Sequence, residues 1–343
     1  MPGQFDSIFT WRKLALSVLF AIVFLATGWS IFWYVAHRLA LRELQETLGQ
    51  EARAGRTWTC KSISSGGYPF SININCDGFS VTADAERGAI VAHARAASVR
   101  APLHSLKRVT VNVESPADVE IPGVVPLVGL EWKTLQFSAR GLPDRLDRLS
   151  ASGSDLSIRI GDAPTSQVAL FQSNVRRAPG ASDGAFNFEF SIGGIRSRIL
   201  DLAIGGEQLA LLAGVGSVTQ VDRGAAGSLP ERMERWRIVG GRAVVNQLTL
   251  LKGDFAIQAE GAIGLDPAHR PEGKIDLRIQ NAADRISGLA RNLGVAGPIA
   301  GALLGGLLPM DRQTGELRLQ ASLDNGRLGI GPFKALVALP PLY

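Results

Sequence analysis

Residues 273–280 read GKIDLRIQ, and residues 316–323 read ELRLQASL. In both stretches an apolar side chain occupies every second position, with charged or polar side chains between them. This two-residue period is typical of a β-strand with one apolar face and one face toward water. Asp324-Asn325-Gly326 follows the second stretch and is typical of a turn between antiparallel strands.

The same alternation recurs in five further stretches. Their apolar positions are Ile72, Ile74 and Cys76; Val109, Val111 and Val113; Leu156, Ile158 and Ile160; Phe186, Phe188, Phe190 and Ile192; and Phe255, Ile257, Ala259, Ile263 and Leu265. One-sided strands predict antiparallel pairing, whereas a doubly wound parallel sheet would show continuous apolar strands between helices. We therefore predict a mainly β fold of the α+β kind, built on a long antiparallel sheet.

Few helices are expected to cover this sheet. Three candidates are residues 144–149, 230–236 and 282–308, the last broken near Gly297-Pro298. Residues 299–308 are apolar on nearly every side. We expect them either to cover the apolar sheet face or to form a deformable lid or membrane-dipping element. Because so few helices cannot cover six or more strands, the sheet is expected to curve, meet a partner or hold a ligand.

The most apolar stretch is residues 14–35, LALSVLFAIVFLATGWSIFWYV, which carries no charge. As a helix it would rise about 33 Å, enough to cross a bilayer. Trp29 and Trp33 near its end suit the headgroup zone. A cleaved signal peptide is the alternative, but it would have a shorter apolar core followed by a small-residue cleavage site. We predict an uncleaved transmembrane anchor.

Four segments follow from these patterns: a short N-terminal tail over 1–13, the anchor over 14–35, a stalk helix over 36–56 and a β-rich domain over 57–343. The stalk prediction rests on Leu41, Leu44 and Leu48, which recur at helical spacing among charged residues.

Cys60 and Cys76 are the only cysteines, and they flank the turn signal Gly66-Gly67-Tyr68-Pro69. If that turn brings two strands together, the cysteines can form a disulfide, which persists only in an oxidising compartment. Two unpaired buried cysteines are the alternative. The turn itself is read as a stapled hairpin or as an edge that contacts a partner.

The sequence lacks the common motifs of catalytic and nucleotide-binding sites. The sequence has no GxSxG nucleophile elbow, no GxxxxGK[ST] phosphate loop and no HExxH helix, and its four histidines are scattered. Acidic residues such as Glu260 and Asp276 fall on the polar side of predicted strands, and no basic stripe with interleaved aromatic residues indicates nucleic-acid binding. We predict no catalytic residue, no metal site, no cofactor and no enzymatic activity.

Apolar residues are the candidate ligand contacts. Three phenylalanines on one strand face could line an apolar pocket, or they could be ordinary core. The candidate set is Phe186, Phe188, Phe190, Phe255, Ile257, Leu303 and Leu307.

Several motifs together resemble a bacterial envelope family, domain of unknown function 2125. They are Cys60 to Cys76 with GYPF inside, WRIVGGR at 236–242, DPAHRPEG at 266–273, Asn325-Gly326-Arg327, Gly331-Pro332 and LPPL at 339–342. Residues 241–279 and 316–332 are also loosely similar to the strand pairs of AsmA-like proteins. The resemblance implies an inner-membrane anchor with a periplasmic, sheet-rich domain and no catalytic residues, and the AsmA-like similarity implies lipid handling along an apolar groove.

The leading hypothesis is a single-pass protein of the bacterial inner membrane whose periplasmic domain binds a lipid or another apolar molecule in a curved sheet. The alternative is a non-catalytic envelope scaffold whose sheet edge or stalk meets a protein partner. An enzyme, such as a hydrolase, is the third and least supported hypothesis.

Overall fold

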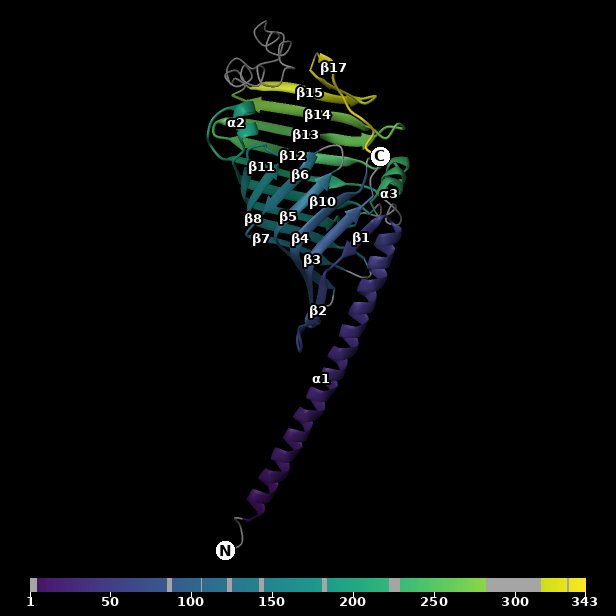
Figure 1. Cartoon of the computed structure of the whole chain (residues 1–343), viewed down its shortest axis with the longest axis vertical. Helices are drawn as coiled ribbons and strands as arrows, with labels where there is room; N and C mark the ends of the chain where they lie inside the picture. The colour runs from purple at the N-terminus through teal and green to yellow at the C-terminus, as the bar shows by residue number, and fades with distance from the viewer. Residues whose placement is uncertain are drawn as a thin grey trace.

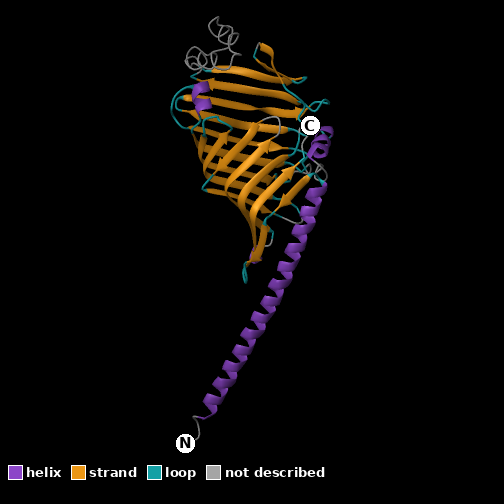
Figure 2. Ribbon diagram, viewed as in Figure 1, coloured by secondary structure: helices purple, strands orange, loops and turns teal. Residues whose placement is uncertain are grey.

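In the computed structural model, one extended antiparallel sheet follows a long N-terminal helix (Figure 2). The structure describes residues 5–343 except 85–87, 106, 122–124, 142–144, 181–183, 222–228, 282–315 and 332. The predicted mainly β fold with an antiparallel sheet is confirmed.

The helices are α1 Phe5–Arg53, α2 Arg198–Ile204 and α3 Leu229–Ile238, with a short 3-10 turn at Leu103–Ser105. The strands are β1 Arg56–Thr59, β2 Ser62–Gly66, β3 Ser71–Ala83, β4 Ile90–Pro102, β5 Arg108–Ile121, β6 Val125–Glu131, β7 Thr134–Arg140, β8 Arg148–Ile160, β9 Ser166–Arg177, β10 Phe186–Ile195, β11 Ala210–Val218, β12 Ala243–Lys252, β13 Phe255–Leu265, β14 Pro271–Gln280, β15 Leu317–Asp324, β16 Arg327–Ile330 and β17 Phe333–Ala338.

Helix α1 combines the predicted anchor and stalk in one continuous helix of 49 residues. At 1.5 Å per residue it is about 75 Å long, and it extends well beyond the sheet (Figure 1). It is long and apolar enough to cross a membrane, and its most apolar window is not buried against the rest of the chain. The prediction of a membrane-spanning segment is confirmed to this extent.

From β3 to β5 and from β8 to β17, each strand pairs with the next one along the chain, so the sheet is a meander. Strands β6 and β7 share one position, because both lie between β5 and β8. Strands β1 and β2 both pair with β3 at the start of the meander. Many of these neighbours are joined by short connections, such as residues 253–254 and 325–326, because antiparallel strands can be linked by tight turns.

The register aligns residues of twelve strands in a single row, which we call the apolar row because ten of the twelve carry apolar side chains and the other two are Ser173 and Gly214. Directly paired residues lie on the same side of a sheet, so the whole row faces one way. The apolar row is Ile74, Val99, Val111, Phe137, Ala151, Ser173, Phe190, Gly214, Leu248, Ala259, Leu277 and Leu319. We call this side of the sheet the apolar face.

A line of irregular positions crosses the first half of the sheet. Gly78 of β3, with φ of 59°, lies opposite Arg95 of β4, and Arg95 faces an extra residue at Ser115-Pro116 of β5. The line continues through the break between β6 and β7 at 132–133 and through Asp155 of β8, whose φ is 51°. Bulges and left-handed positions bend a strand, so bends aligned across neighbouring strands bend the whole sheet.

The alternation of side chains reverses at Asp155. Leu156 Cδ1 lies 3.1 Å from the position that a Cβ of Gly153 would take, so Leu156 lies on the same side as Gly153. Gly153 is two residues after Ala151 of the apolar row and therefore belongs to the apolar face. The reversal keeps Leu156 and, two residues later, Ile158 on the apolar face beyond the bend.

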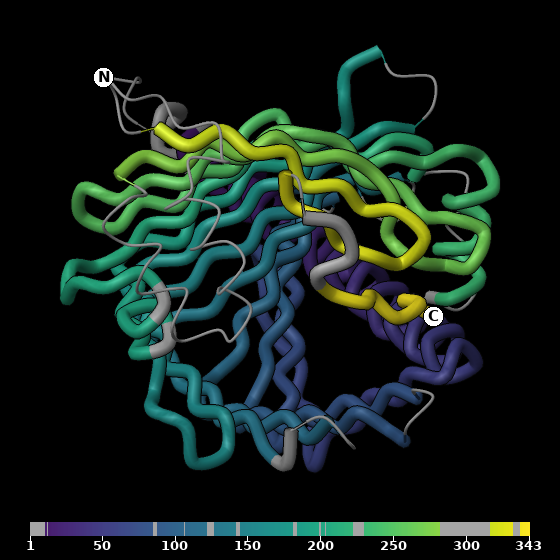
Figure 3. Tube along the Cα trace, turned by 90° about the horizontal axis from the view of Figure 1, so that it is seen from above, coloured from purple at the N-terminus to yellow at the C-terminus, as the bar shows by residue number. Residues whose placement is uncertain are grey.

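The bent sheet curls back on itself. Strands β3 to β6 lie in front of β7 to β12 in Figure 1, and the view along the other axis shows the strands following a curve from β3 to β15 (Figure 3). Most of the buried apolar side chains, including Ile72, Phe186 and Leu317, lie on the apolar face. This agrees with an apolar face on the concave side, where side chains converge.

The described helices lie beside the sheet and do not cover it (Figure 1). Helix α3 confirms the helix predicted over 230–236. The helix predicted over 144–149 is wrong for the described residues, because Arg145–Asp147 form a loop and Arg148 and Leu149 begin β8, paired with β7 and β9. The helix predicted over 282–308 lies outside the described residues.

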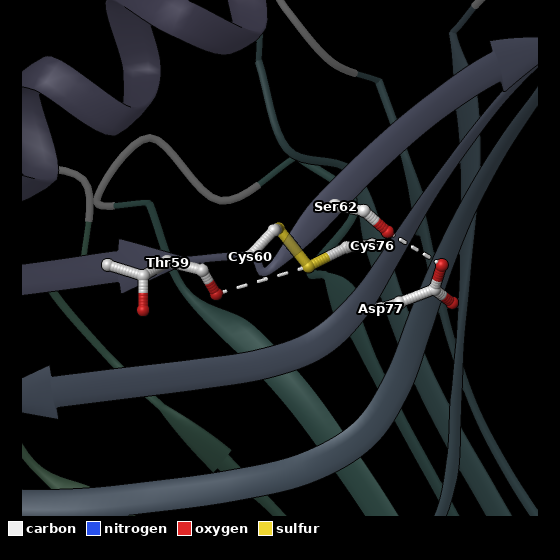
Figure 4. Close-up of a disulfide and its surroundings, with 5 residues drawn as sticks. All are labelled: Thr59, Cys60, Ser62, Cys76 and Asp77. Carbon is white, nitrogen blue, oxygen red and sulfur yellow. Dashed lines mark hydrogen bonds between the residues drawn. A yellow bond between two sulfur atoms is a disulfide. The ribbon is translucent and has the colours of Figure 1, made fainter.

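Cys60 and Cys76 form a disulfide with their Cα atoms 5.4 Å apart (Figure 4). It joins the start of the β2–β3 hairpin to β3, and the adjacent Ser62 hydroxyl donates to the Asp77 carboxylate at 2.9 Å. The prediction of a bonded pair is confirmed, and the alternative of two unpaired cysteines is wrong.

Replacing both cysteines with Ala is expected to lower the free energy of unfolding by about 3 kcal/mol, because the crosslink closes a loop of moderate length in the unfolded chain. The measurement is urea denaturation of the full chain in detergent, with wild type under non-reducing conditions as the reference. An unchanged midpoint would show that the crosslink contributes nothing to the folded domain.

A fully buried lysine lies at one end of the apolar face. Lys252 ends β12 with 1% of its side chain exposed, and it pairs across the sheet with Ala210 and Phe255. Its ammonium group forms an ion pair with Asp201 of α2. Because a buried charge is costly without a partner, this ion pair holds α2 against the end of the sheet.

Asp201→Asn is expected to lower the free energy of unfolding by about 2–4 kcal/mol, since it leaves the buried ammonium without its counter-charge. Denaturation of the full chain in detergent measures the change. Glu114→Gln, which removes the exposed pair with Arg95, is the matched control, with an expected loss of no more than about 1 kcal/mol. Equal effects of the two substitutions would contradict the role given to Lys252.

Candidate functional site

The apolar face extends across twelve strands of the described sheet. A second row runs beside the apolar row along the same face. Its members are Leu135, Gly153, Phe171, Ile192, Leu212, Leu250, Ile257, Ile279 and Leu317. With strands about 4.8 Å apart, the twelve strands of the apolar row extend over about 50 Å.

Much of this face remains partly accessible to solvent. Nine of the twelve residues in the apolar row are half-buried, and only Ile74, Gly214 and Ala259 are buried. Soluble proteins seldom leave a contiguous apolar surface of this extent in contact with water. The apolar face is therefore the candidate binding surface.

The opposite face is mainly polar, although the exposed apolar side chains of Val215 and Leu251 also lie on it. Its paired residues include Asn73, Arg100, Thr110, Ser138, Ser150, Asn174 and Glu189, which follow one another across seven strands. This contrast excludes a sheet that is buried on both sides and leaves the apolar face as the side that needs a partner.

Five of the predicted ligand contacts lie on the apolar face, and the structure divides them into two groups. Phe188, Phe190 and Ile257 are half-buried. Phe186 and Phe255 are only 7% and 5% exposed and belong to the packed core. Leu303 and Leu307 lie outside the described residues. Ligand contact by any of these residues stays a prediction.

Two glycines of β11 shape this face, and the analysis of the sequence did not single them out. A Cβ on Gly214 would lie 2.6 Å from Cε1 of Phe190, so the phenyl ring occupies the space that a side chain would fill. A Cβ on Gly216 would likewise overlap the ring of Phe188. The alternating glycines in AGVGSV, directly opposite alternating phenylalanines, are the signal that could have revealed this packing.

Gly214→Ala is expected to lower the free energy of unfolding by about 1–3 kcal/mol, because the added methyl group forces the Phe190 ring out of its place. Thermal unfolding of the full chain in detergent measures the loss. Adding Phe190→Leu to Gly214→Ala should recover part of it, since the smaller side chain leaves room. A fully stable Gly214→Ala variant would contradict this packing.

Glu260 and Asp276 are direct neighbours on the polar face, because they pair across β13 and β14. The Glu260 carboxylate forms an ion pair with Arg278 at 2.8 Å, and Asp276 accepts a hydrogen bond from Gln320 at 2.9 Å. A cavity of about 230 Å³ lies over this network. The carboxylates are exposed, as expected for a solvated face, and each has a polar partner.

A second group of titratable side chains lies where α3 meets the β13–β14 turn and the last residues. Arg237 and the Tyr343 hydroxyl both donate to the Glu234 carboxylate, and the His269 ring stacks on Tyr343 with centroids 4.4 Å apart. The hydrogen bonds from Arg237, followed by the one from Tyr343, lower the pKa of Glu234 to about 2. These groups satisfy one another and hold the last residues against α3.

Within the part of the chain that the structure describes, no group of three His, Cys, Asp or Glu side chains could hold a metal ion. The apolar face presents few polar atoms, so its geometry suits contact with apolar surface.

The family described as "Uncharacterized protein conserved in bacteria (DUF2125)" matches residues 33–340. The chain belongs to the DUF2125 family. The match begins near the end of the apolar stretch of α1 and extends through β17, so it includes the whole described sheet. Comparisons with curated proteins and with solved structures found no match.

Proposed function

We propose that this DUF2125 protein is anchored in the bacterial inner membrane and binds a lipid or another apolar molecule on the apolar face of its curled sheet. One observation carries the proposal. Ten of the twelve aligned positions along one partly accessible face carry apolar side chains, whereas the opposite face is mainly polar. We also propose that the role is binding without catalysis.

The dimensions and energies fit acyl chains. The hydrocarbon core of a bilayer is about 30 Å thick, so a single acyl chain reaches about 15 Å, and a face of about 50 Å accommodates more than one. Each buried methylene contributes about 0.8 kcal/mol, so ten methylenes against this face contribute about 8 kcal/mol. The looser similarity to AsmA-like proteins, which implies lipid handling, points the same way and stays a prediction.

The proposed compartment is the periplasm. The Cys60–Cys76 disulfide supports it, because structural disulfides persist in oxidising spaces and are rare in the cytosol. Helix α1, which is long and apolar enough to cross a membrane, would hold the sheet domain beside that membrane.

Gently purified full-length protein is expected to carry lipid, and Phe188→Asp is expected to lose it, because the substitution places a charge on the apolar face. Native mass spectrometry and lipid extraction measure retention. Ser191→Asp, an exposed position on the polar side of the same strand, is the matched control and should keep the lipid. Lipid-free wild type, or equal retention by Phe188→Asp, contradicts the proposal and favours the envelope scaffold.

A photo-crosslinking experiment tests the same proposal without requiring that the Phe188→Asp variant folds. The photoreactive residue p-benzoylphenylalanine is placed at Leu277 on the apolar face or at its neighbour Arg278 on the polar face. Irradiation of living cells should give lipid adducts at position 277 and none at position 278. Equal labelling at the two positions would contradict binding on the apolar face.

A further inference from the structure

The turn between β2 and β3 packs against the end of the apolar stretch of α1. The Trp29 indole donates to the carbonyl oxygen of Pro69 at 2.9 Å, and the Trp33 indole donates to that of Ser71 at 2.9 Å. The Tyr68 ring meets the Trp33 ring edge-on, with centroids 5.5 Å apart. The turn therefore lies at the level of residues 29–33 of the helix.

That level is where the helix would leave a bilayer. Trp29 and Trp33 lie in the last two turns of the uncharged stretch 14–35, and Trp33 is only about 3 Å along the helix axis from Val35. Tryptophan and tyrosine side chains concentrate in the headgroup zone, because one part of each ring system is apolar and another donates a hydrogen bond. A turn fixed at this level is fixed at the membrane surface.

The turn leaves two large aromatic side chains partly or largely accessible. Phe70 is 73% exposed. Tyr68 is 56% exposed, although its hydroxyl forms a hydrogen bond with the Ser30 hydroxyl of α1 at 2.9 Å. Their backbone is nevertheless held in place, because Ser71 donates to the Gly67 carbonyl at 2.9 Å and Leu103 donates to the Phe70 carbonyl at 3.0 Å. The Cys60–Cys76 disulfide closes the other end of the hairpin. Exposed aromatic side chains on a braced turn beside the helix are suited to contact with an apolar surface outside the chain.

We propose that Tyr68 and Phe70 insert into the interfacial layer of the leaflet from which α1 emerges, so that the β2–β3 turn is a second membrane contact. The occupant of this surface is the bilayer, since the turn continues the aromatic zone of the anchor. The first strand of the curled sheet is then held at the membrane surface, and the apolar face begins directly beside it at Ile72. The proposal rests on α1 crossing a bilayer and does not require a bound lipid.

The test uses the full chain in nanodiscs of phosphatidylcholine and phosphatidylglycerol. Phe70→Cys is labelled with the environment-sensitive fluorophore NBD, while Cys60 and Cys76 stay bonded and unreactive. The label should emit at shorter wavelength, be quenched at least twofold by lipids with a nitroxide near the headgroup, and resist quenching by iodide. These responses together place the label in the interfacial layer.

Ser62→Cys is the matched control on the same hairpin. It is exposed like Phe70, and at about 3.3 Å per strand residue it lies roughly 15 Å farther from the turn. Its label should behave as in water. Tyr68→Cys gives a second reporter if Phe70→Cys does not form the disulfide, as judged by non-reducing mass analysis.

The proposal would be overturned if the label at position 70 or 68 were quenched by iodide and by nitroxide lipids to the same extent as the label at position 62. Because the readout is depth in the bilayer, lipid-free protein would leave this result unaffected. Equally, if the turn stays in water, the proposal of lipid binding on the apolar face is unaffected, because lipid retention is measured separately.

Discussion

The rest of this structure depends on one constraint, which is that paired residues of neighbouring strands lie on the same side of the sheet. A shift of one residue at any pairing would move a strand's apolar side chains to the polar face. The register from β3 to β15 avoids such a shift along the apolar row, from Ile74 at one end to Leu319 at the other. A sheet with one such face cannot remain flat and bare in water, so it must curl, be covered or hold apolar molecules.

Bulges and left-handed residues allow the sheet to curl while its apolar side chains stay on one face. The aligned bulges and left-handed residues at Gly78, Ser115-Pro116 and Asp155 bend the sheet, and the reversal at Asp155 keeps apolar residues on the same side beyond the bend. Where phenylalanines of β10 cross β11, Gly214 and Gly216 leave room for the rings. The result is an apolar face whose rings are packed and most of whose residues stay half-buried.

Helix α1 is joined to the sheet by a short connection and by side-chain contacts. Helix α1 runs without a break to Arg53, β1 begins at Arg56, and both β1 and β2 pair with β3. The disulfide and the indole hydrogen bonds of Trp29 and Trp33 then fix the β2–β3 hairpin beside the helix. These contacts set where the apolar face begins relative to the apolar segment of α1.

The sequence by itself determined the membrane-spanning stretch, the antiparallel strands and the pairing of Cys60 with Cys76, because each depends on local periodicity, composition or a short turn. It also placed Phe188, Phe190 and Ile257 on apolar sides of their strands. It could not show that these sides coincide across twelve strands, since register is decided by pairing between distant residues. The strand at Arg148 and Leu149, read locally as helix, the burial of Lys252 beside Asp201 and the approach of Tyr68 to Trp33 were decided only by tertiary structure. These features depend on residues that are distant in the chain. The local sequence therefore does not predict which side chains will come into contact.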